Sequence, residues 1–128
     1  MGYTVDLEAD DLRCISKEAA EQAADRINGD LWMSPYHLHV VPEEREGQWI
    51  LSIEHFQGDH WYEDRARSAW ASIAPHMADD ATLEFQGEEG ERWRVRWKGG
   101  RCFEDYVREV VWAENEEIIA PAEQEQPS

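Results

Sequence analysis

The sequence predicts an α+β fold, a two-layer sandwich in which two helices cover one face of a mostly antiparallel sheet. Two segments carry apolar residues at helical spacing, and several others alternate polar and apolar residues as half-buried strands do. Each helix has one apolar stripe and each strand one apolar face, so a sandwich buries both surfaces. The 128 residues are 41% hydrophobic and include seven Trp, enough for a single core. The predicted order is β-αββ-αββ-β, in one domain at residues 1–112.

A first strand is expected at residues 3–7 and a first helix from Lys17 to Asn28. Ser16 is a favourable N-cap, and Gly29 stands where helices commonly end. The apolar stripe of this helix consists of Ala20, Ala23, Ala24 and Ile27. Side chains this small allow the helix to approach a sheet closely.

Two strand-like runs follow at residues 36–41 and 49–56, and a polar connection of hairpin length separates them. In the first run Leu38 and Val40 alternate with His37 and His39. Because side chains alternate between the faces of a strand, both histidines are expected on the face away from the core.

The helix and hairpin pattern then occurs a second time, without residue identity between the halves. Asp59 can cap a second helix, which Pro75 ends near Ala74. The apolar face of this helix consists of Ala66, Ala69, Trp70 and Ile73. Strands at residues 82–86 and 91–98 would share a core face made of Leu83, Phe85, Trp93, Val95 and Trp97. A last strand is expected within residues 106–112.

The charge of the chain excludes two classes of partner. With 29 acidic and 12 basic residues the net charge is −17, which disfavours binding to nucleic acid and to anionic membranes. Residues 113–128 hold five acids, no base and little to bury, and are expected to form a disordered tail. The first eleven residues lack the basic and apolar segments of a secretion signal, so a soluble, cytoplasmic protein is expected. Cys14 and Cys102 are then expected to be free thiols.

Three histidines form a candidate metal site. His37 and His39 are two residues apart, and His55 lies in the partner strand of the predicted hairpin. Imidazoles with a nearby carboxylate suit zinc or iron. The alternative is that these histidines occupy a solvent-facing sheet surface, which the absence of a family-specific ligand spacing favours. No cofactor is therefore expected.

The strand at residues 92–98 carries the one concentration of basic residues. Arg92, Arg94 and Arg96 alternate with Trp93 and Trp97, a combination that can bind single-stranded nucleic acid. Alternation also separates the two kinds of side chain onto opposite faces. The favoured interpretation is an outer face of ion pairs, with partners on neighbouring strands.

The leading functional hypothesis is a non-catalytic module that binds and inhibits a basic protein partner, as immunity proteins and phage antagonists do. The chain lacks the common nucleophile, phosphate-loop, metalloprotease and dinucleotide motifs, which argues against an enzyme. Charge complementarity would select a cationic partner. The candidate contact residues, in aromatic and acidic loops, are Trp32, Met33, Glu43, Glu44, Glu46, Glu88 and Glu89.

Two other functions stay open at this point. One is a metal- or small-ligand-binding protein, possibly an enzyme, that uses His37, His39 and His55. The other is an accessory protein whose charge serves solubility alone. For Trp32 and Met33, closure of the core is as good an interpretation as partner binding.

Part of the sequence resembles a family of uncharacterised small proteins from actinobacteria and their phages. The resemblance lies in an acidic, Gly-rich turn followed by a Trp-Arg strand and a terminal Val-Trp, at residues 87–97, 99–101 and 110–112, and in residues 1–4. It implies a cytoplasmic protein from a high-GC bacterium or phage. It carries no catalytic residues over to this chain.

Overall fold

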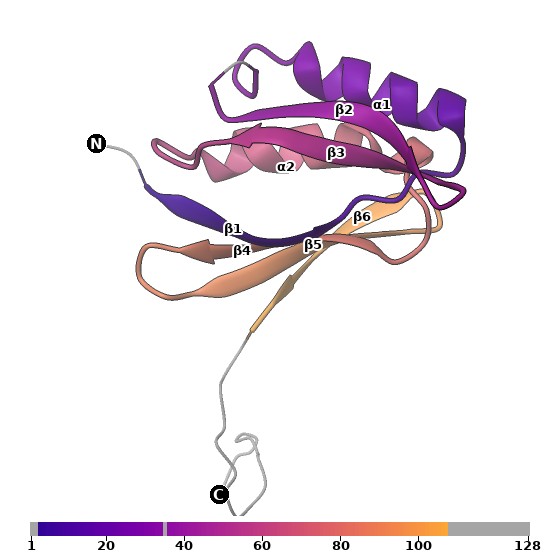
Figure 1. Cartoon of the computed structure of the whole chain (residues 1–128). Helices are drawn as coiled ribbons and strands as arrows, with labels where there is room; N and C mark the ends of the chain where they lie inside the picture. The colour runs from indigo at the N-terminus through magenta and orange to yellow at the C-terminus, as the bar shows by residue number, and fades with distance from the viewer. Residues whose placement is uncertain (1–2, 35, 108–128) are drawn as a thin grey trace, which may run out of the picture.

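The computed structural model describes residues 3–34 and 36–107, which contain two α-helices and six strands (Figure 1). The order of the elements is the predicted one. The bounds are β1 Val5–Asp11, α1 Lys17–Asn28, β2 Leu38–Arg45, β3 Gln48–Phe56, α2 Glu63–Ser72, β4 Ala81–Gly87, β5 Arg92–Lys98 and β6 Arg101–Tyr106.

The strands form two antiparallel sheets instead of one continuous sheet. One has four strands in the order β1-β4-β5-β6, and the other is the β2-β3 hairpin. Backbone bonds join the two sheets near both ends of β1, with Val5 N donating to Gly58 O at 3.0 Å and Leu51 N to Leu12 O at 2.9 Å. β1 and β3 therefore belong to separate ladders that meet at two points.

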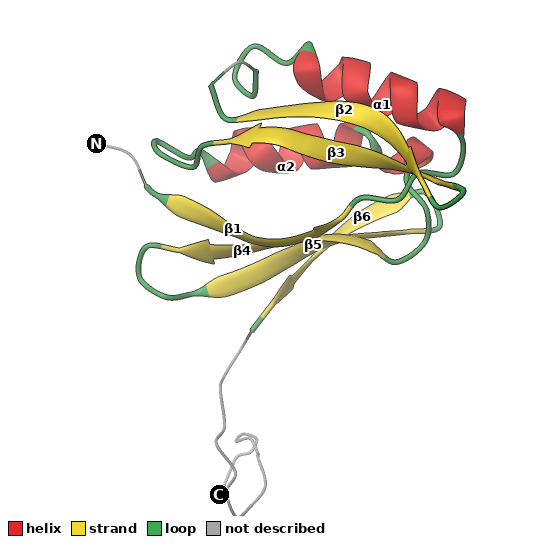
Figure 2. Ribbon diagram, viewed as in Figure 1, coloured by secondary structure: helices red, strands yellow, loops and turns green. Residues whose placement is uncertain are grey.

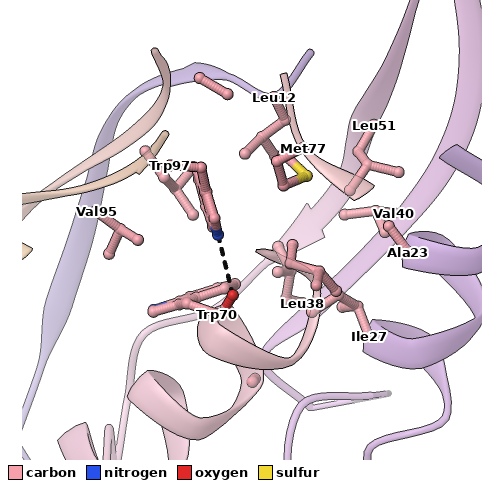
Figure 3. Packing of buried hydrophobic residues seen from close by; sticks show 14 of the residues in the cluster. Leu12, Ala23, Ile27, Leu38, Val40, Leu51, Trp70, Met77, Val95 and Trp97 are labelled. Atoms are coloured by element: carbon pink, nitrogen blue, oxygen red, sulfur yellow. Dashed lines mark hydrogen bonds between the residues drawn. The ribbon is translucent and has the colours of Figure 1, made fainter. Parts of the chain in front are cut away.

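The helices provide the second layer, which confirms the predicted α+β sandwich (Figure 2). α1 packs on the β2-β3 hairpin, and α2 lies over the four-stranded sheet. Trp97 of β5 donates its indole N–H to the carbonyl of Trp70 in α2 at 3.0 Å (Figure 3). Phe85 of β4 stacks on Trp70 with the ring centres 6.0 Å apart. The residues buried between helices and sheets form one continuous apolar cluster.

α1 begins and ends where the sequence predicts. The Ser16 side chain accepts a hydrogen bond from Ala19 N at 3.1 Å, and all four residues of the predicted stripe are buried. Asn28, the last residue of α1, binds the backbone of Val40 twice: its amide donates to Val40 O at 2.8 Å, and its carbonyl accepts from Val40 N at 3.1 Å. One side chain thus occupies part of the outer edge of β2.

The first hairpin is longer and its turn tighter than predicted. β2 continues through Pro42 to Arg45, and the turn is formed by Glu46 and Gly47, with φ of 54° and 82°. Two residues with positive φ are characteristic of the two-residue turns that join twisted antiparallel strands. The predicted start of the strand is also wrong, because Tyr36 and His37 precede β2.

α2 carries the predicted buried face, with Ala66, Ala69, Trp70 and Ile73 all enclosed. Its N-cap is Tyr62 and not Asp59, and no side chain caps this end. The helix ends at Ser72, and a short 3-10 turn at Ala74–His76 contains Pro75.

The last strand differs most from the prediction. β6 is Arg101–Tyr106, directly after a turn in which Gly99 and Gly100 have φ of 60° and 76°. β6 itself was not predicted, because its polar and apolar residues do not alternate as they do in a typical half-buried strand. Residues 108–112 and the predicted tail at 113–128 lie outside the described residues.

In the part of the chain that the structure describes, neither helix is both long and apolar enough to cross a bilayer.

Candidate functional site

The two predicted acidic turns lie at opposite ends of the molecule (Figure 1). The Glu46–Gly47 turn lies at the end of the molecule where Arg13 pairs with Ile50. Glu43 and Glu44 lie near this turn, in β2. The turn with Glu88 and Glu89 belongs to the other end, where β4 finishes opposite Val5. These acids therefore do not make one contact surface.

The aromatic loop between α1 and β2 lies at the same end as Glu88 and Glu89. Met33 is fully buried and closes the core. Trp32 is half-buried, with its ring centre 4.4 Å from that of His37 and 5.2 Å from that of Trp61. The most exposed apolar residues here were not among the predicted contacts: Leu31, Tyr36 and Tyr62 are 87%, 67% and 59% exposed.

The three histidines do not share one face. His37 is 6% exposed, and its Nδ1 lies 2.8 Å from the carbonyl oxygen of Gln57, so its expected outward position is wrong. The reason is that His37 precedes β2 and so does not follow the strand alternation. His39 and His55 are opposite each other in the hairpin, and His39 lies 3.9 Å from Glu54. Among the described residues no group of three or more His, Cys, Asp or Glu side chains is arranged to hold a metal ion.

The basic strand β5 forms ion pairs on the outer face of the sheet. Arg94 and Arg96 both bind the carboxylate of Asp105 on β6, at 2.8 and 2.9 Å. Hydrogen bonds from the two guanidinium groups lower the pKa of Asp105 to about 2. Trp93 and Trp97 of the same strand are buried on the inner face. As expected, the arginines and the tryptophans of β5 lie on opposite faces of the sheet. The partner of Arg94 and Arg96 is an aspartate of β6.

Cys14 and Cys102 are both free. Burial raises the pKa of each thiol to about 11. Both therefore stay protonated at neutral pH and are poor nucleophiles.

A pocket of about 290 Å³ lies where α2 begins, at the end of the molecule that also carries the aromatic loop. It is small, since ligand pockets commonly measure about 300–1,000 Å³. Its walls come from the N-terminal segment, α2, β5 and β6, and the lining residues are Tyr3, Trp61, Glu63, Arg67, Glu91, Trp93 and Tyr106. No pattern in the sequence indicated this pocket.

Strand alternation puts a carboxylate on the inner face of the sheet beside the pocket. Glu104 is paired with Val95 and Tyr106 with Trp93, so both side chains share the face of the buried residues of β5. Glu63 is the first residue of α2, and Arg67 follows one turn later. The N-terminal segment is held near the β4-β5 turn, where Thr4 N donates to Glu88 Oε1 at 2.9 Å.

These side chains form a connected polar network. Arg67 Nε donates to Glu104 Oε1 at 2.8 Å, and Tyr106 donates its hydroxyl hydrogen to the same oxygen at 2.5 Å. Arg67 Nη2 also donates to the Tyr106 hydroxyl at 2.9 Å, and its Nε lies 3.8 Å from Glu63. Three other buried polar atoms of the described residues have no hydrogen-bond partner: Tyr3 Oη, Trp61 Nε1 and Glu104 Oε2.

Glu63 and Glu104 respond differently to this environment. Burial and the neighbouring carboxylate of Glu104 raise the pKa of Glu63 to about 7, although Arg67 partly opposes the shift. Burial acts against ionisation of Glu104 as well, yet interactions with Glu63, Tyr106 and Arg67 lower its pKa overall. Near neutral pH Glu104 is therefore ionised, and a proton held by the pair is on Glu63.

Carboxyl pairs with separated pKa values are common in functional sites, because one group can bind a proton or a cation while the other stays charged. The signal in the sequence was weak. A glutamate in a short strand with other charged residues is expected to be exposed to solvent. The inward position of Glu104 follows from its pairing with Val95, which depends on the fold.

The chain matches no family model, no curated protein and no solved structure. The resemblance to the uncharacterised actinobacterial and phage family stays a prediction.

Proposed function

We propose that this protein is a non-catalytic module that binds a basic protein partner and blocks it stoichiometrically. The observation that carries the proposal is the group of exposed apolar side chains at the pocket end of the molecule. Leu31 and Tyr36 flank Trp32, and Tyr62 follows Trp61, whose ring packs on Trp32. Large apolar and aromatic side chains in exposed loops are the residue types from which binding hot spots are built.

The charges around this end favour a cationic partner. Glu88 and Glu89 are exposed in the β4-β5 turn, which lies at the same end as the aromatic loop. Two of the arginines of β5, Arg94 and Arg96, are bound to Asp105 on the outer face of the sheet, so their charge is already balanced. Glu88 and Glu89 thus form an acidic rim beside the exposed apolar side chains. Such a rim speeds association with a basic surface and selects against acidic surfaces.

The test uses the immobilised full-length chain to capture proteins from the native host at low and at high salt. We expect one basic protein to be retained at low salt and its retention to fall steeply as salt rises, because the rim charges are exposed. Recovery of no basic protein at low salt would contradict the proposal.

Surface variants then locate the contact. In the double variant Leu31→Ser with Tyr36→Ser we expect the affinity for the captured protein to fall at least about tenfold. Ile15→Ser is the matched control, since Ile15 is also exposed, at 64%, but precedes α1 at the other end of the molecule. A chain shortened to residues 1–112 should bind as the full chain does. Equal loss in the double variant and the control would place the contact elsewhere.

A second candidate function is small-ligand binding, and the pocket beside Glu63 is the observation that favours it. In the predicted alternative the ligand was held by histidines. The pocket offers instead aromatic rings and carboxylates, without any histidine in its lining.

A further inference from the structure

The lining of the pocket has a definite chemical character. Four of its seven residues are aromatic, namely Tyr3, Trp61, Trp93 and Tyr106. Two of the others are the carboxylates Glu63 and Glu91, and the seventh, Arg67, is bound to Glu104. Aromatic faces together with carboxylates attract organic cations, because the rings present negative electrostatic potential to a positive group.

We propose that this pocket binds an alkylammonium group, the side chain of a lysine on the partner protein. The inference rests on the proposed function, because the partner is taken to be basic. It adds the site at which one cationic side chain is held.

An unpartnered atom at the pocket supports a ligand that donates hydrogen bonds. Tyr3 lines the pocket, and its buried Oη can accept an N–H but has no hydrogen-bond partner. A buried acceptor without a hydrogen bond is unfavourable, so such an atom commonly indicates a missing group. An ammonium carries three N–H donors, so it can donate to Tyr3 Oη and to the carboxylates Glu63 and Glu91 in the lining.

The chain is packed so that Tyr3 and Glu91 come close together at the rim. Gly87 lies beneath them, and a Cβ at that position would be 2.2 Å from Tyr3 Oη and 2.6 Å from the carboxyl carbon of Glu91. A side chain at position 87 would therefore displace the ends of both side chains. This packing places the Glu91 carboxylate beside the unpartnered hydroxyl of Tyr3.

The location and size favour a side chain over a larger free ligand. A volume of about 290 Å³ accommodates one slender side chain. Trp61 lines the pocket and also packs on Trp32, so the pocket adjoins the exposed loop proposed as the contact surface. A lysine from a protein seated on that loop can enter the pocket directly.

Binding of a cation should be coupled to the charge of Glu63. The groups around Glu63 are Arg67 on α2, Glu104 and Tyr106 on β6, Glu91 and Trp93 at the start of β5, and Tyr3 and Trp61. An ammonium favours the ionised carboxylate, whereas low pH favours the protonated form. With a pKa of about 7, Glu63 is mostly ionised at pH 8 and mostly protonated at pH 6.

The experiment titrates n-butylammonium into the ¹⁵N-labelled full-length chain and follows the indole N–H of Trp61 and the amide of Glu63 by NMR. We expect saturable shifts at these positions and a dissociation constant about five- to tenfold weaker at pH 6 than at pH 8. n-Butanol and butyrate, of the same length but neutral or anionic, should give no saturable shifts. Equal binding of n-butanol, or no shift with n-butylammonium up to about 0.1 M, would overturn the proposal.

Glu63→Gln separates the role of the charge from that of the shape. Glutamine has the size of a protonated glutamate, so the variant should bind n-butylammonium more weakly than the wild type at pH 8 and with no change down to pH 6. Glu43→Gln at the opposite end is the control, and it should keep the wild-type affinity and pH dependence. A pH dependence that persists in Glu63→Gln would contradict the role of this carboxylate, and the wild-type titration tests the site even if the variant does not fold.

A further comparison identifies the source of the ammonium. A blocked pentapeptide with a central lysine flanked by glycines should bind at least as tightly as n-butylammonium, and its norleucine analogue should not bind. Binding of n-butylammonium without binding of the lysine peptide would overturn the assignment to a protein side chain. If the full-length chain captures a basic partner but its pocket binds no amine, this inference is refuted and the proposed function still stands.

Discussion

At the scale of single residues, the charge of this protein is distributed less evenly than its sequence indicates. Asp105 binds two arginines on the outer face of the sheet, whereas Glu104, its neighbour in the chain, faces inward and binds Arg67. Adjacent carboxylates thus belong to different surfaces because β6 alternates. The inward one, together with Glu63, gives the molecule a group that titrates near neutral pH.

Glu63 should make the stability of the protein depend on pH. Its pKa is raised in the folded state, so its contribution is fully present below the ordinary pKa of 4.5 and is lost as pH rises through about 7. We expect Glu63→Gln to lose less stability than the wild type between pH 5 and pH 8, by about 1–2 kcal/mol after allowance for partial exposure. Urea unfolding at the two pH values measures this difference. The same pH response in both proteins would refute it.

At the scale of elements, local signals decided how much could be predicted. α1 was predicted fully, because its cap, its stripe and its terminal glycine are all local features. β4 and β5 were predicted on their correct faces, since Leu83, Phe85, Trp93 and Val95 alternate clearly. β6 was missed because its residues carry no apolar pattern, and the division into two sheets depends on contacts between segments distant in sequence.

The candidate site was out of reach for a related reason. Glu63 and Glu104 are 41 positions apart, and nothing in the local sequence of either marks them as neighbours. The inward position of Glu104 depends on its pairing with Val95. The buried position of His37 likewise depends on where β2 starts. The strand starts two residues later than predicted, and His37 therefore precedes it.

The double hydrogen bond from Asn28 to Val40 predicts a role for one side chain at the edge of β2. Asn28→Ala removes both bonds and leaves the N–H and C=O of Val40 without this partner, so we expect a loss of about 1–3 kcal/mol in the free energy of unfolding. Chemical denaturation measures the loss. Arg26→Ala is the control, since Arg26 is an exposed residue in the last turn of the same helix. An equal effect of both substitutions would show that helix propensity explains the loss.

At the scale of the whole molecule, the features that we propose to bind a partner lie at one end. The pocket, the aromatic loop and the Glu88–Glu89 turn lie together there, and the turn at Glu46 lies at the other end. A partner that uses the pocket end would leave the Glu46 turn free. Labels and fusions placed at that turn should therefore not disturb binding.

Gly58 holds the two sheets together at the pocket end. It is buried, and a Cβ there would lie 1.7 Å from the carbonyl oxygen of Val5, whose amide donates to Gly58 O. Gly58→Ala should therefore force β1 away from the segment after β3 and cost about 2–3 kcal/mol, the range of overpacked sites. Thermal and urea unfolding measure the cost. Ala71→Ser, at an exposed position of α2, is the control, and a loss in Gly58→Ala no larger than in the control would contradict this account.

The two-point attachment between the sheets has a consequence for the dynamics of the protein. The backbone amides of Val5, Cys14, Leu51 and Trp61 donate the hydrogen bonds across this boundary, whereas the ladders on either side are longer runs of paired residues. Such boundaries are where a native protein opens without global unfolding. In hydrogen-exchange measurements these four amides should exchange sooner than those inside β4 and β5, so the molecule would open along this boundary while each of its two sheets stays closed.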